Sequence, residues 1–597
     1  MRLERTLDAL AAAALQEALG LDEAPPALIR KTQDPKFGDF QVNGVMALAK
    51  RQKANPRELA APVAERLAAL PAIAKAEVAG PGFVNLTLDP AWLGTRLSED
   101  AGDGRLGVDP VETSETIVVD FSSPNIAKQM HVGHLRSTIL GQALVQLLRC
   151  IGHRVIGDNH LGDWGTQFGL LIVGLRTFGD EAALEADAIV ELERVYKAAS
   201  ARAKEDEAFA AEARAELAKL QQGDPDNRAT WERMVATTRE TLDTIYARLG
   251  TTFDEWLGES AYDAMLPGVV GELEAKGIAR EDEGALCVFL NELDPAAIDG
   301  ALPDAIPKKL KKNGTPFIVR KSDGAFLYST TDIATILHRR DVFDADRSVY
   351  VVGAPQGLHF RQLFATVRLL GVDMALEHVA FGQILDAETG KILRTRGGTT
   401  VTLRSLLDEA EERAREKIEE QRAEGRLRIA DADMDEAVAT IGIGAVKYVD
   451  LQQNRLTDYR FDFDKMVSFS GNAGPYLQYQ YARIRSIFRK GEVDWETPAG
   501  AIVPEEPSEL TLAKTLLRFG DVVHEAAETY QPHLLCGHLY DVAQAFSRFY
   551  TACPVLDAAG LDAEGATRTS RLALTQLSGR QLEEGLALLG IGVLARM

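Results

Sequence analysis

The sequence predicts an α/β protein with a doubly wound, Rossmann-like parallel sheet at its centre, an N-terminal α+β domain and a C-terminal α-helical bundle. Strand and helix patterns alternate from Thr116 to about Gly398, which is typical of a parallel sheet covered by helices. The first 110 residues mix helical and strand patterns, and helical periodicity dominates from Leu403 onward. The expected domains are residues 1–110, 111–400 and 401–597.

The N-terminal domain begins with an amphipathic helix over Leu3–Leu19, and a second helical pattern starts at Gly44. The turn at Gly80-Pro81-Gly82 leads into a strand that ends near Leu88. The segment Gly102-Asp103-Gly104 predicts a linker to the central domain.

The central domain opens with the buried strand Ile117-Val118-Val119, and a helix is expected from His131 to about Ile151. Between about residues 177 and 300 the alternation is interrupted by a helical run, Asp180–Leu249, and a strand-rich piece around Gly284–Leu290. This interruption predicts an insertion between the two halves of the sheet. The Ala/Glu-rich part of the insertion is expected to be a solvated outer surface.

Composition favours a large enzyme without a membrane span. The 597 residues carry a formal net charge of −23 and contain four cysteines, which are scattered without a C-x-x-C pair, as in reduced cytoplasmic proteins. No apolar run reaches 18 residues, so no membrane helix is expected. No heptad seam stands out, and we expect a cytoplasmic monomer that does not bind DNA.

Two segments are rich in basic residues, although the chain as a whole is acidic. The segment Leu302–Lys321 has six basic residues and one acid, and Ile441–Lys490 has eight basic residues, four acids and nine tyrosines and phenylalanines. Interleaved aromatic and basic side chains suit unpaired bases and phosphates. A solvated loop for the first segment and a packed helical core for the second remain the alternatives.

The most informative motif is His131-Val132-Gly133-His134, at the start of the predicted helix. Two imidazoles three residues apart share one side of the first helical turn, where unpaired N–H groups and the positive end of the helix dipole favour phosphates. A side chain at Gly133 would hold an adenine ring away from the backbone. The alternative is a metal pair or a chance match, but no Cys or carboxylate follows at ligand spacing.

The surrounding block resembles the arginyl-tRNA synthetases, a family of class I aminoacyl-tRNA synthetases. The similar segments are Pro124-Asn125-Ile126-Ala127-Lys128, His131–Thr138, whose H-x-G-H corresponds to the family's HIGH signature, and Gly162–Gly169. The resemblance extends from Gly38–Gln41 to Ile591–Met597. It implies that ATP and L-arginine form arginyl adenylate and that arginine passes to the 3′ end of tRNA(Arg). It also implies that activation needs bound tRNA.

In this resemblance His131, Gly133 and His134 bind ATP, and the two histidines stabilise its phosphates during catalysis. The family's second, lysine-bearing loop corresponds to Lys391–Gly398, which lacks the second lysine. Lys128 is expected to compensate, together with Arg394 and Arg396, although an exposed loop is the alternative for the two arginines. Mg²⁺ is expected to enter with ATP, without a dedicated protein metal site.

Recognition of arginine requires buried carboxylates, because a guanidinium is a planar and permanently charged fork. The sequence alone favours Asp332 as a helix N-cap, whereas the resemblance implies that Tyr328 and Asp332 hold the substrate side chain with Asp120 as the second acid. The resemblance places Ser123 and Asn125 at the amino and carboxylate groups. Gln356 and His359 are expected to line the same cleft or to contact the adenosine.

The flanking domains resemble tRNA-binding domains of the family. Phe83 and Asn85, two apart on one strand face, are expected to grip a D-loop base. In the helical anticodon-binding domain Tyr476 and Arg483 are expected to contact RNA, while Tyr479 and Phe549 are expected in the core. No editing domain is evident. The alternatives are a catalytically silent relative that binds tRNA or senses arginine, and a nucleotidyltransferase that shares the H-x-G-H fold.

Overall fold

The structure, a computed structural model, describes residues 3–597 except 33, 388, 392–400 and 558–564. The chain forms two compact units, one comprising residues 1–111, 418–441 and 468–597 and the other comprising 112–417 and 442–467. The limit between the units near residue 111 lies where the sequence predicts a domain boundary. Residues 401–417 and 442–467 instead group with the central α/β part, and not with the rest of the C-terminal helices.

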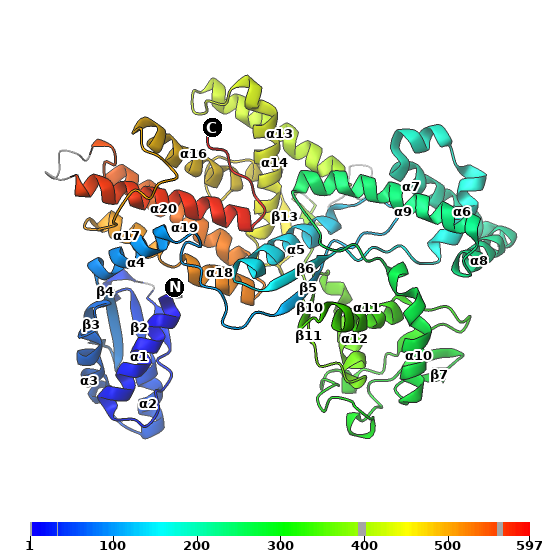
Figure 1. Ribbon diagram of the computed structural model, residues 1–597, viewed down its shortest axis with the longest axis horizontal. Helices are drawn as coiled ribbons and strands as arrows, with labels where there is room; N and C mark the ends of the chain where they lie inside the picture. Colours follow the sequence, from blue (N-terminus) through cyan, green and yellow to red (C-terminus); the bar gives the residue numbers. More distant parts are fainter. Residues whose placement is uncertain (1–2, 33, 388, 392–400, 558–564) are drawn as a thin grey trace. The chain divides into compact units, whose positions relative to one another are not determined.

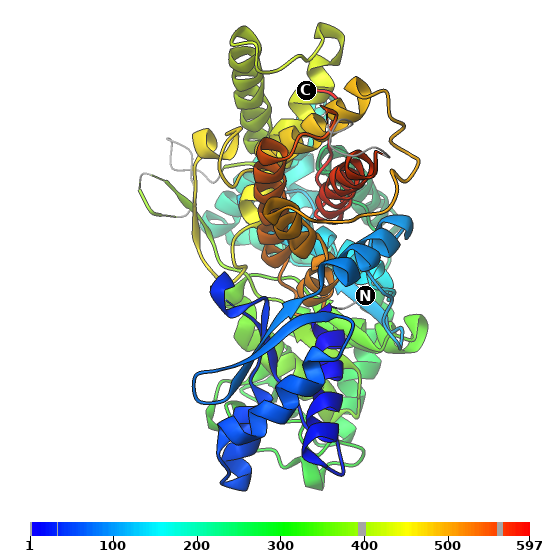
Figure 2. The same ribbon diagram turned by 90° about the vertical axis from the view of Figure 1, so that its left-hand side faces the viewer.

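The N-terminal part of the first unit is a four-stranded antiparallel sheet in the order β1-β2-β4-β3. Helices α1 to α3 pack against it (Figure 2). Asn55 caps α3, where its side chain accepts a hydrogen bond from the N–H of Arg57, and Pro56 occupies the first helical position. The elements are α1 (Leu3–Leu19), β1 (Ile29–Lys31), β2 (Phe40–Val42), α2 (Gly44–Gln52), α3 (Pro56–Ala68), β3 (Ile73–Ala79), β4 (Phe83–Leu88) and α4 (Pro90–Gly102).

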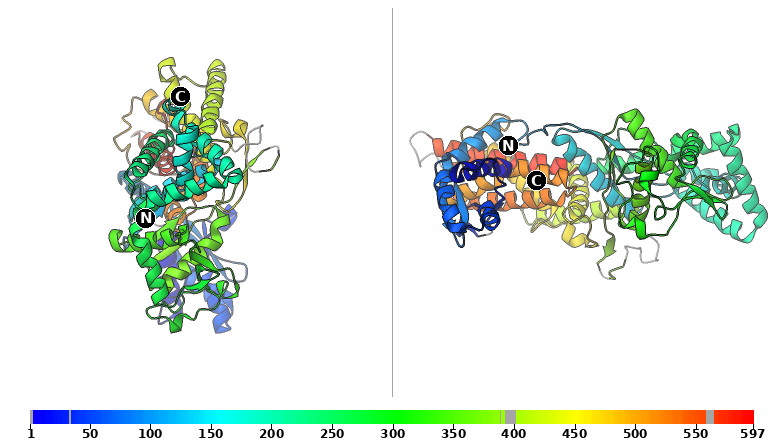
Figure 3. Two further views of the ribbon diagram at one scale, coloured as in Figure 1. Left: turned by 90° about the vertical axis from the view of Figure 1, so that its right-hand side faces the viewer. Right: turned by 90° about the horizontal axis from the view of Figure 1, so that it is seen from below.

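The C-terminal helices complete the first unit, and α19 packs against α17 and α20 (Figure 3). Their bounds are α16 (Gly474–Lys490), α17 (Pro507–Leu516), α18 (Phe519–Glu528), α19 (His533–Ala552) and α20 (Ala566–Leu588). Helix α4 packs on α17 and α20, and Lys514 forms an ion pair with Asp39 at 2.7 Å. The two ends of the chain, which the sequence predicts as separate domains, therefore share one compact unit.

The second unit is built on a parallel sheet in the order β11-β10-β5-β6, as the sequence predicts for the central domain (Figure 1). Its register places Tyr350, Asp120 and Asp158 in one row where β10, β5 and β6 end. Ligands of doubly wound folds bind outside the carboxyl ends of such strands. The sheet elements are β5 (Thr116–Asp120), α5 (Val132–Cys150), β6 (Arg154–Asp158), α11 (Tyr328–Phe343), β10 (Arg347–Tyr350), α12 (Gly357–Leu369) and β11 (Ala375–His378).

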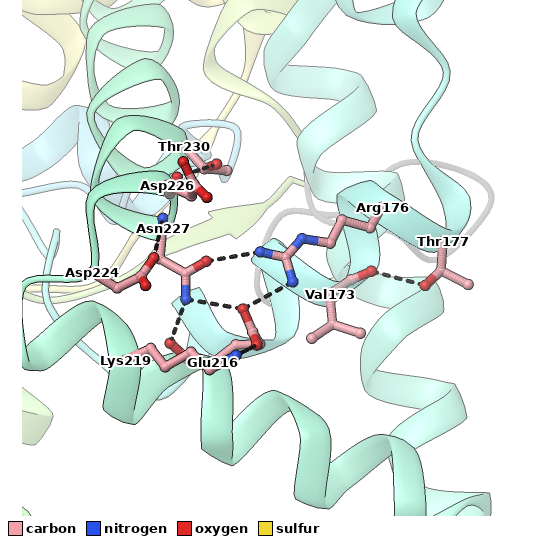
Figure 4. A network of polar contacts seen from close by, with 9 residues as sticks. All are labelled: Val173, Arg176, Thr177, Glu216, Lys219, Asp224, Asp226, Asn227 and Thr230. Atoms are coloured by element: carbon pink, nitrogen blue, oxygen red, sulfur yellow. Dashed lines mark hydrogen bonds and ion pairs between the residues drawn. The ribbon is translucent and has the colours of Figure 1, made fainter.

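The expected insertion consists of helices and a small antiparallel sheet, β7-β8-β9. Within about residues 177–300 its elements are α7 (Glu181–Glu205), α8 (Glu207–Gln221), α9 (Pro225–Leu249), α10 (Leu266–Ala275), β7 (Arg280–Asp282) and β8 (Ala285–Val288), whereas α6 (Gln167–Phe178) leads into this region and β9 (Phe317–Arg320) follows it. Figure 4 shows how Arg176 of α6 donates to Glu216 of α8 and Asn227 of α9 at 2.9 and 2.8 Å. Hydrogen bonds from Lys219 first, and then from Asn227 and Arg176, lower the pKa of Glu216 to about 2. This network holds α6, α8 and α9 together.

The remaining elements follow the parallel sheet in sequence. They are β12 (Ile384–Asp386), α13 (Leu403–Ala423), α14 (Met434–Leu451), β13 (Tyr459–Phe461) and α15 (Phe463–Met466). Strands β12 and β13 pair in parallel. Among the described helices, none is long and apolar enough to cross a membrane.

Candidate active site

The two histidines of the H-x-G-H motif cap the N-terminus of α5. Nδ1 of His131 accepts a hydrogen bond from the N–H of Gly133 at 3.0 Å, and Nδ1 of His134 accepts one from the N–H of His131 at 3.1 Å. The rings lie 4.0 Å apart between centroids. These bonds satisfy two N–H groups that a helix start would otherwise leave unpaired.

The capping bonds also determine where each ring carries its proton. Because both Nδ1 atoms accept hydrogen bonds, the neutral rings carry their proton on Nε2 and can donate from that atom. Burial, and then the neighbouring His131, lowers the pKa of His134 to about 3, and burial lowers the pKa of His131 as well. The motif thus offers two neutral N–H donors beside a helix N-terminus.

Gly133 is required by the capping geometry. A Cβ at this position would lie 2.8 Å from Cε1 and 2.9 Å from Nδ1 of His131. Any larger residue would push the imidazole off the helix end. This steric reason adds to the predicted approach of adenine to the backbone.

The histidine pair borders a cavity of about 580 Å³. Its lining comes from the loop after β5, the start of α5, the segment after β10 and the segment that leads into β12, and includes Ser122, Ser123, His131, Gly133, His134, Arg136, Gln356 and Phe381. Arg136 ties α5 to the β12 side, since it forms an ion pair with Asp450 at 2.8 Å and donates to the carbonyl of Thr457 at 3.2 Å. None of the described lining residues is a carboxylate.

The loop between β5 and α5 is strained. Ser122, Ser123 and Ala127 have φ values of 72°, 46° and 61°, a left-handed conformation that is rare outside glycine and collects at functional sites. Helix α9 holds this loop from outside. The hydroxyls of Tyr246 and Ser122 are 2.7 Å apart, and Thr238 Oγ1 accepts from the N–H of Ala127 at 3.3 Å.

Asp120 lies at the carboxyl end of β5, as predicted, but its carboxylate is already paired. One Nη atom of Arg339 donates to Asp120 Oδ2 and to Asp158 Oδ2, each at 2.7 Å, and Arg339 is fully buried. The hydroxyl of Ser123 donates to Asp120 Oδ1 at 2.9 Å. Asp120, Asp158 and His160 lie close enough to share a metal ion, but Arg339 occupies both acids.

Asp332 lies in the second turn of α11, whose N-cap is Leu327. The capping alternative is therefore wrong for Asp332. Its Oδ2 is 2.6 Å from His359 Nε2, and the His359 ring lies 5.0 Å from the ring of Tyr328. His359, which is expected to line either the arginine cleft or the adenosine, thus lies beside the residues assigned to arginine.

A further acid, Glu259, interacts electrostatically with Asp332. It follows Gly258, and its Oε2 accepts from the N–H of Trp164 at 3.3 Å. Burial, and to a smaller extent the negative charge of Asp332, raises the pKa of Glu259 to about 7, although His160 opposes the shift. The structure therefore offers two half-buried carboxylates, Asp332 and Glu259, whose charges interact.

Comparison with known proteins decides the family. The model of the class I (R) tRNA synthetase catalytic domain matches residues 102–463, the arginyl-tRNA synthetase N-terminal domain matches 5–88, and the DALR anticodon-binding domain matches 477–597. The chain belongs to the arginyl-tRNA synthetases. The arginine–tRNA ligases of Edwardsiella ictaluri and Laribacter hongkongensis are 43% and 44% identical to it, over 97% and 99% of both chains.

Solved structures agree with this assignment. The arginyl-tRNA synthetase of Thermus thermophilus has a TM-score of 0.79 at 26% identity and covers all of both chains. That of Plasmodium falciparum has a TM-score of 0.81 at 25% identity, over 100% of this chain and 99% of the other. The three predicted parts, an α+β N-terminal domain, a class I catalytic domain and a helical anticodon-binding domain, are confirmed.

The segment that follows the second loop of the synthetase is hydrogen-bonded to the histidine motif. The carbonyl of Val401 accepts from the N–H of Val132 at 3.2 Å, and the N–H of Leu403 donates to the carbonyl of Met130 at 2.8 Å. Arg394 and Arg396 lie outside the described residues. Residues 401–403, which follow this loop in the sequence, are thus hydrogen-bonded beside the HIGH signature.

Lys128 is held away from the main cavity. Its Nζ lies 5.2 Å from the ring centroid of Tyr196 on α7, and it lines a smaller pocket with Thr402 and Arg404. A cation over an aromatic face is held only weakly. The contact with Tyr196 therefore restrains the ammonium group of Lys128 only weakly.

Of the other residues assigned to arginine, Gln356 lines the cavity, whereas Asn125 does not. Asn125 is exposed and packs on Gly162, where a Cβ would lie 2.2 Å from its Oδ1. Asn125 and Gly162 both belong to segments that carry the family resemblance.

Of the residues assigned to tRNA, Phe83, Asn85 and Arg483 lie in the matched flanking domains, and Tyr476 lies one residue before the anticodon-binding match. Asn85 is buried, and its Oδ1 accepts from Gln41 at 2.8 Å, while Phe83 is half-buried on the same strand. Tyr476 accepts from Gln544 at 3.2 Å, and Arg483 lies over the ring of Tyr550. Phe549 is fully buried, which confirms its expected core position, whereas Tyr479 is only half-buried.

Sequence reasoning missed Glu259, although a signal was present. Asp163, in the Gly162–Gly169 motif, accepts from the N–H and the hydroxyl of Ser260 at 2.8 and 2.7 Å. A Cβ at Gly258 would lie 2.4 Å from the Asp163 carboxyl. Asp163 of the motif therefore contacts the residues on both sides of Glu259. The sequence signal for Glu259 is the triplet Gly258-Glu259-Ser260.

Replacing Tyr246 with phenylalanine should raise the KM for arginine about 5- to 30-fold, because the loop loses a hydrogen bond worth about 1–2 kcal/mol. The hydroxyl contacts Ser122 and also accepts from Asn159 at 3.1 Å, which itself accepts from the N–H of Ser123. Steady-state kinetics with each substrate varied in turn would measure the effect. Thr244→Val is the control, since the Thr244 hydroxyl bonds only within α9; an equal effect there would contradict the role of Tyr246.

Proposed function

We propose how the residues of this arginine–tRNA ligase divide the work of its reaction. The carboxylate of arginine attacks the α-phosphate of ATP, pyrophosphate leaves, and arginyl adenylate forms. A terminal ribose hydroxyl of tRNA(Arg) then attacks the adenylate carbonyl and releases AMP. Neither step needs a covalent protein nucleophile, so the enzyme acts by alignment and by stabilising charge.

The observation that carries this proposal is the pair of neutral Nε2–H donors beside the cavity. His131 and His134 donate to phosphate oxygens of ATP, where negative charge develops as the α-phosphate is attacked. Because the donors are fixed by their capping bonds, little reorganisation is needed during the reaction. Gly133 leaves room for the adenosine beside them.

Asp332 and Glu259 receive the guanidinium of arginine, and Tyr328 lies against its side chain. His359 orients Asp332 through the 2.6 Å contact. The negative charge of Asp332 disfavours ionisation of Glu259 until a cation binds, because like charges repel in a half-buried site. A guanidinium relieves this repulsion and satisfies both acids bidentately.

The other end of arginine is bound by the strained loop and its neighbours. Ser123 and Gln356 line the cavity, and Asn125 follows on the same loop. Asp120 acts on this end through the hydroxyl of Ser123 and not on the guanidinium, because Arg339 already neutralises it.

Positive charge for pyrophosphate comes from Lys128, Arg394 and Arg396. Mg²⁺ enters on the phosphates of ATP, which fits a cavity whose described lining contains imidazoles and hydroxyls but no carboxylate. Phe83, Asn85, Tyr476 and Arg483 contact tRNA(Arg). We also expect the synthetase to act as a monomer in the cytoplasm.

The test is aminoacylation of tRNA(Arg) with labelled arginine, alongside citrulline and lysine. Arginine should be charged, and citrulline should be rejected strongly, because its uncharged head leaves a buried acid unpaired. Pyrophosphate exchange should be negligible until tRNA is added. Absence of charging would overturn the assignment, and vigorous exchange without tRNA would overturn the tRNA requirement.

A further inference from the structure

A lysine-rich loop in the second unit carries charge that the reaction described so far does not use. Lys308, Lys309, Lys311 and Lys312 are all exposed. The one acid of the segment, Asp304, is paired with Arg368 at 2.5 Å. Among the described residues, none of the four ammonium groups forms an ion pair with an acid.

The loop is firmly anchored, so its charges are held in place. Ala305, Ile306 and Leu310 are buried in the hydrophobic core of this unit. The N–H of Leu310 donates to the carbonyl of Pro307 at 2.9 Å, and a short 3₁₀ turn over Leu310–Lys312 presents lysines on both sides of the buried leucine. An ordered basic surface loses less entropy on binding than a flexible tail would.

The same loop runs directly into the arginine end of the active site. Gln362 of α12 donates to the carbonyl of Thr315 at 2.8 Å, and the ring of Phe317 lies 5.6 Å from His359. Helix α12 and strand β9 therefore support both the lysines and the residues around Asp332.

We propose that Lys308, Lys309, Lys311 and Lys312 bind backbone phosphates of the tRNA next to its 3′ end. The chain has a net charge of −23, so the protein as a whole repels polyanions. Four lysines within five residues, none in an ion pair among the described residues, provide a local positive surface that can attract phosphates. The tRNA must bring its 3′ end to the cavity, and the lysines belong to the unit that contains it. This inference rests on the ligase activity, which brings the RNA to this unit.

The test replaces all four lysines with glutamine. The KM for tRNA should rise at least about 10-fold near 0.15 M salt, and the slope of log affinity against log salt should become shallower by up to about 3, because each lost phosphate contact removes about 0.7–0.9 of slope. The KM values for arginine and ATP should be unchanged. The corresponding four-arginine variant, which keeps the charge, should retain tight binding.

The matched control neutralises four exposed basic residues that are already paired with acids, Arg202, Arg214, Arg228 and Arg340. It changes the net charge by the same amount. An unchanged tRNA KM and salt slope in the lysine variant, or an equal change in the control, would overturn the inference. Absence of tRNA charging by the wild type would instead count against the ligase function.

Discussion

Replacing His131 or His134 with asparagine should lower the rate of arginyl adenylate formation about 10²- to 10³-fold, the usual effect of removing one preorganised donor to a developing negative charge. Asparagine is a good N-cap residue, and its side-chain oxygen can replace Nδ1 as the acceptor of the capping bond. The variant therefore keeps the start of α5 and loses only the Nε2–H donor. Pyrophosphate exchange with tRNA present would measure the loss.

Glutamine at position 134 is the matched comparison, because its amide nitrogen lies near the place of Nε2. It should recover part of the rate that asparagine loses. Thermal unfolding of both variants should match the wild type, since helix α5 stays capped. A histidine-to-asparagine variant with an undiminished rate would contradict the assignment of the pair to phosphate.

The depressed pKa values of the histidines also predict the response to pH. Because both pKa values lie below 6.5, the pair should add no acidic limb to the rate between about pH 7 and 8. Below the ordinary histidine pKa of 6.5, the unfolded chain binds a proton at this residue. In the folded protein His134 stays neutral there, because its pKa is about 3. Stability contributed by this residue is therefore present above pH 6.5 and is lost as pH falls toward 3.

Features that depend on local sequence were predicted well. The strand Ile117–Val119, the helix after His131 and the histidine pair on its first turn all follow from apolar patterning and helix-end chemistry, and the structure contains β5, α5 and the capping histidines at these places. The N-terminal and anticodon-binding domains were predicted from motifs and are confirmed by the family models.

Features that depend on long-range pairing were not predictable in the same way. Arg339 lies 219 residues from Asp120, and no local pattern shows that it neutralises this acid. Asp332 raises the pKa of Glu259 although the two acids lie far apart in the sequence, and no local pattern shows this interaction. Grouping of residues 1–111 with 468–597 depends on contacts such as Lys514 with Asp39, which periodicity does not encode.

Replacing Asp332 with asparagine should lower kcat/KM for arginine about 10²- to 10³-fold, since loss of one partner of a hydrogen-bonded charge pair costs about 2–5 kcal/mol. The KM for ATP should change little, because Asp332 is not among the residues that line the main cavity. Glu259→Gln should act in the same direction. Asp341→Asn is the control, since Asp341 pairs on the same helix with exposed Arg340.

The pKa of Glu259, which burial raises to about 7, gives this prediction a second measurement. Below pH 7 the carboxyl is protonated and binds a guanidinium poorly, so the KM for arginine should fall as pH rises from 6 to 8. In Glu259→Gln this dependence should disappear. In the free enzyme the raised pKa has the opposite consequence, because stability contributed by Glu259 is present below its ordinary pKa and is lost as pH rises toward 7.

Asp120 separates the two possible assignments of the second acid. Because its carboxylate is bonded to Arg339 and Ser123, Asp120→Asn should lower the thermal stability, as breaking a buried pair costs about 3–5 kcal/mol, and should disturb the amino-acid end of the substrate. Selectivity for arginine over citrulline should then survive in Asp120→Asn and collapse in Asp332→Asn and Glu259→Gln. If selectivity were instead lost only in Asp120→Asn, Asp120 would be the acid that binds the guanidinium, and Glu259 would have no part in binding it.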